Sequence, residues 1–322
     1  MMTQRTQTSS CTLRYKQRFV TSCRPLVTLS SAAPGKTTLG FVGMGILGVP
    51  MTLNLLKAGY EVVVYNRNIQ KTDPVVAAGA QVATTPRECA QRAQYIFATL
   101  SDPQAAISVA NGPDGIASGI SAGKGYIDIS TVDAETSNII ATAIKSTGAS
   151  FLEAPVSGSK APAEQGKLIF LTAGDEELFK AVEGPLDVMG KAKYYLGGVG
   201  SGANMKLVVN MLNGSMMAAL AEAMALADKS GLSQADLLEV LSLGAMANPM
   251  FALKGPAVVE RSYPPAFPLK HQQKDLRLAL ALGDSLGQPL PVAAAANEAY
   301  KMAKAKGQAN SDMAAVYEAT QH

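Results

Sequence analysis

The chain has 322 residues, of which 48% are hydrophobic and 16% charged, and its formal net charge is +3. This length predicts two domains, each with its own hydrophobic core, and the composition excludes disorder over most of the chain. Three Cys and two His, in no metal-ligand spacing, exclude a catalytic zinc site and a disulfide framework. The net charge is too small to mark a nucleic-acid-binding protein, so no nucleic-acid partner is expected.

The N-terminal segment is basic and contains no acidic residue, since the first one in the chain is Glu61. It is rich in Arg, Ser and Thr and lacks an uninterrupted apolar core, a composition typical of an organellar transit peptide. We expect residues 1–35 to be a disordered transit peptide for import into a plastid (chloroplast) or a mitochondrion; an untargeted tail is the alternative. Without this segment five of the 28 basic residues are lost, which leaves 23 against 25 acidic residues.

Short apolar runs alternate with helix-length segments from residue 39 to about residue 150. The runs are rich in Val, Ile and Tyr and nearly continuous, as in parallel strands that are covered on both faces. We therefore predict an α/β fold, with a doubly wound Rossmann sheet in residues 36–200. The predicted strands are Leu39–Val42, Glu61–Tyr65, Gln81–Ala83, Tyr95–Thr99 and Tyr126–Ile129, with a further one at Leu168–Thr172.

The character of the sequence changes after Gly202, where strand patterns end and one long helical pattern runs from Asn204 to Ser230. We predict that residues 201–322 form an all-α domain for substrate binding and dimerisation, joined to the sheet domain by this helix. Polar residues such as Lys206 and Asn210 interrupt the helix, so no membrane span is expected. Its apolar face should pack on the other domain or on a second subunit, which predicts a homo-oligomer (a dimer or a tetramer).

A glycine-rich loop directly follows the first predicted strand and precedes a helical pattern. In this context G-x-G-x-x-G is typical of dinucleotide binding: the glycines allow a tight turn, close approach of a pyrophosphate and close helix–strand packing. The pyrophosphate would lie at the N-terminus of the helix. The predicted cofactor loop consists of Gly43, Met44, Gly45, Ile46, Leu47 and Gly48.

The second predicted strand ends at Asn66 and Arg67, where proteins that bind NAD usually have a carboxylate for the ribose hydroxyls. Asn66 is neutral, and Arg67, with Lys71 nearby, can form a bidentate contact with a 2′-phosphate. We therefore predict NADPH/NADP+ as the cofactor; a solvated surface arginine is the alternative.

Three further clusters offer candidate catalytic groups. Small residues at 154–159 can present N–H groups to a carboxylate ligand, although an ordinary loop would look the same. Lys206 and Asn210 share one helix face at spacing i, i+4, so Lys206 is a candidate proton donor; a solvent-facing lysine is the alternative. His271 and Asp275 share the same spacing, and a surface pair is the favoured interpretation there.

Together these motifs resemble the β-hydroxyacid dehydrogenase family over residues 38 to about 318, most closely the plant-type glyoxylate/succinic semialdehyde reductases. The segments that carry the match are LSDP (100–103), GYIDISTVDAETS (125–137), APVSGSKAPAE (154–164) and YPPAFPLKHQQKDLRLALALG (263–283). The resemblance implies roles for ten residues: Lys206 and Asn210 as catalytic residues, Ser157, Gly158, Phe267 and Asp275 at the substrate, and Leu100, Ser101, Thr131 and Lys274 at the cofactor.

The reaction implied by the resemblance is reduction of glyoxylate to glycolate, and of succinic semialdehyde to 4-hydroxybutyrate, by NADPH, with Lys206 as general acid. A 3-hydroxyisobutyrate dehydrogenase and a tartronate semialdehyde reductase are the alternative enzymes, since they share the glycine loop and the Lys/Asn pair. A non-catalytic Rossmann binding protein is the alternative from another class, and the presence of Lys206 argues against it.

Overall fold

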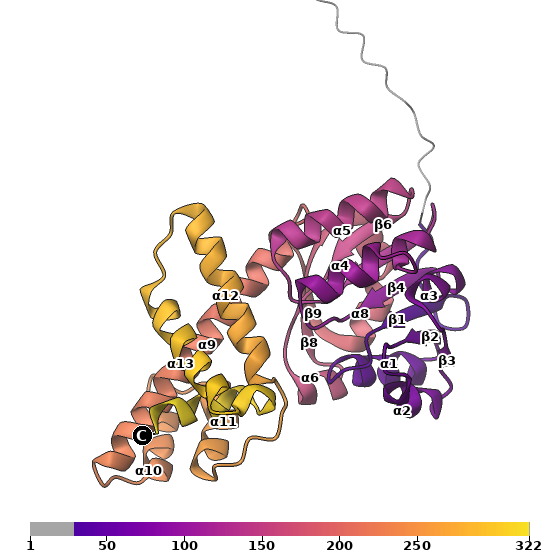
Figure 1. The fold of residues 1–322 in the computed structure, drawn as a ribbon. Helices are drawn as coiled ribbons and strands as arrows, with labels where there is room; N and C mark the ends of the chain where they lie inside the picture. The colour runs from indigo at the N-terminus through magenta and orange to yellow at the C-terminus, as the bar shows by residue number, and fades with distance from the viewer. Residues whose placement is uncertain (1–28, 322) are drawn as a thin grey trace, which may run out of the picture.

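The computed structural model describes residues 29–321, which form a sheet domain and a helical domain lying side by side (Figure 1). In the sheet domain the elements are β1 (Thr38–Val42), α1 (Gly48–Lys57), β2 (Glu61–Tyr65), η1 (Ile69–Thr72), α2 (Asp73–Val76), β3 (Gln81–Val82), α3 (Pro86–Arg92), β4 (Tyr95–Ala98), α4 (Pro103–Asn111), η2 (Ile116–Ser118), β5 (Gly125–Asp128), α5 (Ala134–Ser146), β6 (Ser150–Glu153), β7 (Val156–Ser157), α6 (Lys160–Glu164), β8 (Leu168–Gly174), α7 (Glu176–Ala181), α8 (Glu183–Met189) and β9 (Gly190–Tyr195). In the helical domain they are α9 (Ser201–Lys229), α10 (Gln234–Leu243), α11 (Pro249–Val259), α12 (Leu269–Leu286), α13 (Pro291–Ala305), η3 (Gln308–Asn310) and η4 (Met313–Thr320).

The described strands form one sheet in the order β3-β2-β1-β4-β5-β6-β8-β7, with β9 paired to β8. The first six strands in this order are parallel, as the continuous apolar runs predicted. Because β1 lies between β2 and β4, the chain reverses direction across the sheet there, and the loop after β1 opens at this switch point.

The far edge of the sheet differs from the purely parallel prediction. β8 runs antiparallel to β6 and β7, and β9 is parallel to β8. No strand was predicted at β6, β7 or β9. The last of these, with sequence GKAKYY, is largely exposed and carries two lysines, as edge strands often do, so no apolar run marks it.

Helices cover both faces of the sheet, each over its own apolar cluster. Buried side chains of α3, α4 and α5, such as Cys89, Ala106 and Ile140, pack on one face. Side chains of α1, α7 and α8, such as Met51, Leu178 and Leu186, pack on the other. The doubly wound Rossmann prediction is therefore confirmed.

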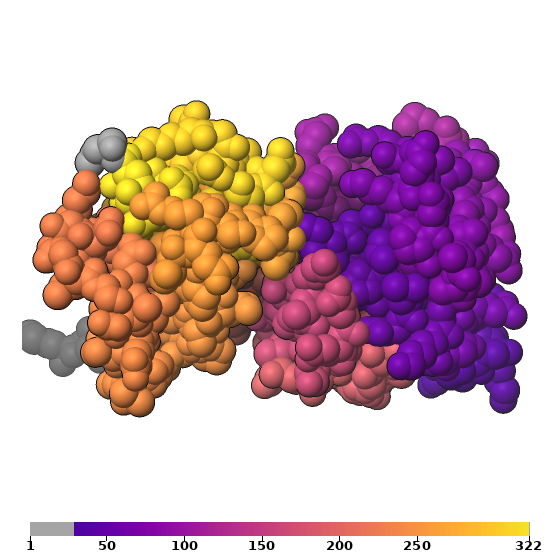
Figure 2. Space-filling model, turned by 90° about the horizontal axis from the view of Figure 1, so that it is seen from below, coloured from indigo at the N-terminus to yellow at the C-terminus, as the bar shows by residue number. Residues whose placement is uncertain are grey.

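In the helical domain α9 packs against α12, α13 and η4, and Figure 2 shows this domain (orange to yellow) beside the sheet domain (indigo to magenta). The predicted long helix is confirmed, beginning at Ser201 and ending at Lys229. By length and composition α9 could cross a membrane. Lys206 and Asn210 of this helix are buried at its contact with α12, where Asn210 donates to Asp275.

The predicted leader, residues 1–35, lies mostly outside the described residues. The part that is described, residues 29–35, packs on the sheet domain: Leu29 and Ala32 contact the cluster on the α1 face. The Ala32 N–H donates to the Ala181 carbonyl (2.8 Å), and the Tyr95 hydroxyl donates to the Ser30 carbonyl. Residues 29–35 thus have the contacts of a domain segment.

Candidate active site

The loop between β1 and α1 has a backbone that only glycine fits at two of its positions. Gly43 has φ +97°, and a Cβ there would lie 2.2 Å from the Thr99 carbonyl oxygen. A Cβ on Gly48 would lie 1.9 Å from the Gly43 carbonyl oxygen. At Gly45, in contrast, a Cβ would meet no atom within 4 Å. Two glycines therefore close the turn, and the third leaves an open surface.

This loop fits the pyrophosphate of a dinucleotide. The surface above Gly45 is open to a ligand, and the first N–H groups of α1 have no acidic residue beside them in the first turn. The Met44 N–H is held by the Asn66 Oδ1 atom (2.9 Å), and the Asn66 amide donates to the Asn68 carbonyl. Asn66 therefore shapes the loop, while Arg67 and Lys71 are exposed beside it.

Three more residues predicted to contact the cofactor follow β4 and β5, whose carboxyl ends lie at the same edge of the sheet as the glycine loop. The Leu100 N–H donates to the Ser130 hydroxyl (3.0 Å), and the Ser101 hydroxyl donates to Asp102 (2.6 Å). The Thr131 carbonyl accepts a hydrogen bond from Lys274 of α12. This last contact ties the helical domain to the edge of the sheet.

Lys206 stands at the centre of a buried polar cluster between α9 and α12. Its Nζ donates to Asn210 Oδ1 (2.7 Å), and Asn210 Nδ2 donates to Asp275 Oδ2 (2.6 Å). Lys274 Nζ lies 2.9 Å from Asp275 Oδ1. The structure thus brings together the predicted proton donor, its amide neighbour, and two residues placed here only by resemblance.

The surroundings of Lys206 suit a proton donor that works near neutral pH. Burial lowers the pKa of Lys206 to about 8, the nearby Asp275 carboxylate raises it, and the Lys274 ammonium lowers it further. Such a pKa leaves the amine mostly protonated at pH 7 while making its proton easier to give up than that of an ordinary lysine.

Gln272 is a member of this cluster that the sequence did not single out. Its side-chain amide donates to the Asn210 carbonyl (2.9 Å), and its oxygen accepts from Asn213 (3.3 Å). A Cβ on Gly214 would lie 2.4 Å from Gln272 Nε2, so glycine lets the two helices approach here. The polar stripe at 206, 210 and 213 pointed to partners of this kind, but it did not identify them.

The predicted carboxylate loop follows β6. Ser157 pairs with Ile169 of β8, and β7 contacts α9. Gly158 has φ +128° and is exposed, and a Cβ there would lie 2.8 Å from Leu168 Cδ2. The loop is thus a built turn beside the helix that carries Lys206.

Phe267 lies in the loop before α12, where it packs on the core of the helical domain. Asp312 fixes its backbone: the Asp312 carboxylate accepts from the Phe267 N–H (3.0 Å) and the Ala266 N–H (3.1 Å). The Nζ of Lys254 on α11 donates to both carboxylate oxygens of Asp312, at 2.7 Å and 2.8 Å, and so compensates this buried charge. Neither Asp312 nor Lys254 was singled out in the sequence, because their partners are distant along the chain.

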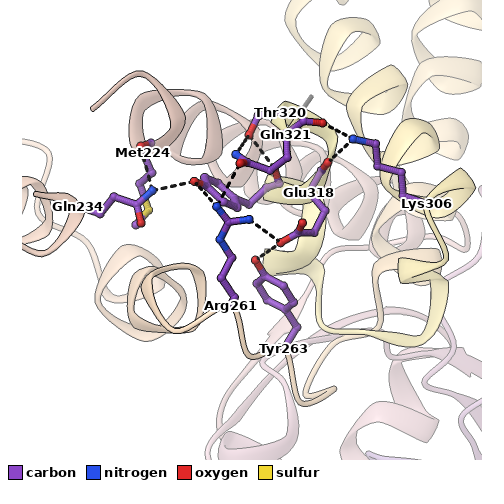
Figure 3. Close-up of polar contacts among 9 residues, drawn as sticks. Met224, Gln234, Arg261, Tyr263, Lys306, Glu318, Thr320 and Gln321 are labelled. Carbon is purple, nitrogen blue, oxygen red and sulfur yellow. Dashed lines mark hydrogen bonds and ion pairs between the residues drawn. The ribbon is translucent and has the colours of Figure 1, made fainter. Parts of the chain in front are cut away.

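A second set of contacts holds the start of the same loop to η4 (Figure 3). The Tyr263 hydroxyl donates to Glu318 (2.7 Å), and the Arg261 guanidinium lies over the Tyr317 ring, 4.7 Å from its centroid. Lys306 donates to the Glu318 carbonyl (2.9 Å). The segment that leads into α12 is therefore fixed at both ends.

Two other candidate groups stay apart from this chemistry. The surface pair expected for His271 and Asp275 is wrong, because Asp275 is buried and makes its contacts with Asn210 and Lys274. Burial lowers the pKa of His271, which favours the neutral imidazole. The Cys89 thiol is buried in the sheet domain, where burial raises its pKa to about 12. Among residues 29–321, no group of three or more His, Cys, Asp or Glu is placed to hold a metal ion.

Comparison with protein families matches both domains. Residues 38–198 match the NAD binding domain of 6-phosphogluconate dehydrogenase. Residues 200–320 match the family described as NAD-binding of NADP-dependent 3-hydroxyisobutyrate dehydrogenase. The two matches meet at the start of α9.

Among curated proteins, two from Arabidopsis thaliana are each 56% identical to the chain. One is named glyoxylate/succinic semialdehyde reductase 2, chloroplastic (88% of this chain and 80% of that protein), and the other glyoxylate/succinic semialdehyde reductase 1 (87% and 97%). Cytokine-like nuclear factor N-PAC from Homo sapiens is 44% identical over 91% of this chain but only 53% of its own length.

Among solved structures, 3-hydroxyisobutyrate dehydrogenase from Salmonella typhimurium matches with a TM-score of 0.82 at 28% identity, over 88% of this chain and 99% of that one. Both domains and their connection by the long helix are thus shared with a known dehydrogenase. The chain belongs to the β-hydroxyacid dehydrogenase family, a family of NAD(P)-dependent oxidoreductases.

Proposed function

We propose that this protein reduces glyoxylate to glycolate, and succinic semialdehyde to 4-hydroxybutyrate, with NADPH. The observation that carries the proposal is the buried Lys206, hydrogen-bonded to Asn210 and with a pKa of about 8, on the helix that contacts the candidate carboxylate loop. The names and 56% identity of the two Arabidopsis relatives support the choice of substrates.

The residues divide the work in the following way. NADPH, when bound, supplies the hydride, while the protein supplies placement and charge. Ser157 and Gly158 anchor the substrate carboxylate and fix the position of the aldehyde carbon. The Lys206 ammonium stabilises the negative charge that develops on the aldehyde oxygen and then protonates it. Asn210 holds the amine through its Oδ1 atom, and Asp275 holds Asn210.

The preference for NADPH over NADH rests on the residues at the end of β2. Asn66, Arg67 and Lys71 place no carboxylate there, and both basic side chains are exposed beside the glycine loop. An exposed guanidinium can bind a 2′-phosphate with two parallel hydrogen bonds, whereas a carboxylate would repel it.

The direct test is a panel of short aldehyde acids (glyoxylate, succinic semialdehyde, tartronate semialdehyde and methylmalonate semialdehyde), each assayed with NADPH and with NADH. We expect the largest kcat/KM for the first two substrates with NADPH. Faster turnover of either branched or hydroxylated semialdehyde would instead favour the tartronate semialdehyde reductase or 3-hydroxyisobutyrate dehydrogenase alternative, which the match at residues 200–320 keeps open. Absence of NADPH oxidation with every substrate would favour a binding protein without this activity.

We propose that the protein is a homo-oligomer, because α9 is apolar on its exposed side as well as its buried side. Its exposed apolar side chains recur at helical spacing and form a stripe that only Glu222 interrupts; the stripe consists of Met205, Val208, Leu212, Ala219 and Leu226. A second copy of the chain would remove this stripe from water. Sedimentation analysis should give the mass of a dimer or tetramer, and Leu212→Glu should shift it toward the monomer.

We also propose import into an organelle, with plastid favoured because one Arabidopsis relative is named chloroplastic. Residues 29–35 contact the sheet domain, so we place the end of the transit peptide before Leu29 and not at residue 35. Fluorescent fusions of residues 1–28 would identify the compartment, and the N-terminal sequence of the imported protein would give the cleavage site.

A further inference from the structure

The helix that carries Lys206 begins without a capping side chain of its own. Its N-cap residue is Gly200, whereas α3, α4, α5, α10 and α11 are each capped by the side chain directly before them. The cap of α9 comes instead from the sheet domain. Glu153 Oε1 accepts from the N–H groups of Gly200 (2.9 Å), Gly202 (2.7 Å) and Ala203 (3.2 Å).

Glycines make this approach of sheet and helix possible. Gly200 has φ +99°, a backbone conformation that other residues rarely adopt. A Cβ on Gly202 would lie 2.4 Å from the Leu171 carbonyl oxygen and 3.1 Å from Glu153 Oε1. The glycines of the sequence GVGSG (198–202) therefore allow the two domains to approach closely at this junction.

Glu153 is linked to both parts of the proposed active site, to one through its backbone and to the other through its side chain. Along its own strand, β6, the chain continues to Ser157 and Gly158, four and five residues later. Through its side chain it holds the start of α9, and Lys206 follows Gly200 by six residues, a rise of about 9 Å along the helix. One buried side chain thus connects the carboxylate loop with the proton donor.

We propose that Glu153 is a positioning residue, which sets the distance between the carboxylate loop at Ser157 and Gly158 and the amine of Lys206. It touches neither substrate nor cofactor. Asn210 and Asp275 fix the Lys206 side chain from the α12 side, and Glu153 fixes the helix backbone from the sheet side. This inference rests on the proposed role of Lys206.

The negative charge of Glu153 strengthens this junction. The carboxylate is 1% exposed, and the N–H groups at a helix start favour a negative partner. Burial raises the pKa of Glu153, whereas Ser137 and the three N–H groups lower it. The neighbouring Asp128 on β5 has its own pKa raised to about 6, chiefly by burial.

Two independent variants test the proposal. Glu153→Gln keeps the shape but removes the charge from the cap. Gly202→Ala keeps the charge but pushes the helix start away from Glu153 and Leu171. In both we expect kcat with glyoxylate to fall by about 10- to 100-fold, the effect of moving a catalytic group by up to 1 Å, while the NADPH Kd stays unchanged.

A second measurement needs neither substrate nor cofactor. In protein labelled with ¹³C-lysine, the Cε shift of Lys206 should titrate with a midpoint of about 8 in the parent protein. Loosening the helix start lets water reach the amine, so we expect the midpoint to rise by about one pH unit in both variants.

The matched control is Thr85→Ala, which removes the cap of α3 in the sheet domain, where Thr85 Oγ1 accepts from the Glu88 N–H (3.0 Å). It should lower Tm without changing kcat or the Lys206 midpoint. If both test variants lower Tm but leave kcat and the midpoint unchanged, Glu153 only stabilises the fold and the proposal is wrong. If the parent protein reduces no aldehyde, the proposed function fails, and the titration still decides whether Glu153 positions Lys206.

Discussion

The cofactor loop and the Lys206 cluster are built in opposite ways. The loop is one continuous segment, and its shape depends on two glycines and on Asn66, which is 22 residues away. In the cluster, Asn210 and its partner Asp275 are 65 residues apart, on two helices that meet only when the helical domain has formed. Local changes should therefore affect the two sites independently, the first through cofactor affinity and the second through proton transfer.

The sharpest test of this separation is Lys206→Ala. Loss of a general acid lowers the rate by about two to four orders of magnitude. We expect a fall of this size in kcat with glyoxylate, and no change in the NADPH Kd measured by fluorescence titration. Turnover within a few-fold of the parent enzyme would show that another group donates the proton.

The opposite result is expected for Gly45→Ala. A Cβ at this position meets no protein atom within 4 Å, so the fold should keep its Tm, but the methyl group occupies the surface on which a pyrophosphate would lie. We expect the NADPH Kd to rise by roughly 10- to 100-fold, because a methyl group forced into a packed contact costs about 1–3 kcal/mol.

Gly48→Ala differs from Gly45→Ala because it should affect both the stability of the fold and the binding of NADPH. The new Cβ would lie 1.9 Å from the Gly43 carbonyl oxygen. This variant should therefore lower the free energy of unfolding by roughly 1–3 kcal/mol and also weaken the binding of NADPH. Unchanged NADPH affinity in Gly45→Ala would show that the cofactor does not lie on this loop.

Arg67→Glu tests the cofactor preference within the same region. A hydrogen bond to a charged group contributes about 1.5–3 kcal/mol, so the NADPH Kd should rise roughly 10- to 100-fold, with little change for NADH. The control is Lys57→Glu, the same charge reversal at an exposed site on α1 away from the end of β2. An equal effect of Arg67→Glu on both cofactors would refute the assignment of Arg67 to the 2′-phosphate.

The smallest expected effect lies in the pH dependence. Lys206 donates a proton only as an ammonium, so kcat/KM should fall as the pH rises through about 8. Because the Asp275 carboxylate raises the pKa of Lys206, Asp275→Asn should move this fall to lower pH, by about one unit. Asp284→Asn, an exposed change on the same helix, should leave the profile in place.

The same contrast explains what the sequence could predict. The cofactor loop was readable because strand, glycines and helix follow one another, and the bounds of β2 were predicted to the residue. Lys206 and Asn210 were readable because both lie on one helix face. The substrate and cofactor roles of Asp275 and Lys274 came from family resemblance alone, since their partners Asn210 and Thr131 are 65 and 143 residues away.

Other structural features could not be recognised from any pattern in the sequence. Glu153 ends a strand of four residues that was not predicted, and its partners lie 47 to 50 residues further along the chain. Asp312 and Lys254 resemble ordinary surface charges until their burial is known. The predicted leader extended to residue 35 because composition does not distinguish a transit peptide from a polar segment that packs on the domain.

The contact between Asp312 and Phe267 also sets an order of events during synthesis. The glycine loop can make its contacts with Thr99 and Leu100 as soon as these two residues have been made. The loop at Phe267 lacks its anchor until α12 and α13 have been completed, because Asp312 follows Phe267 by 45 residues. Since chains grow from the N-terminus and their domains fold as units, the half that binds the cofactor matures first, and the loop at Phe267 is anchored only afterwards.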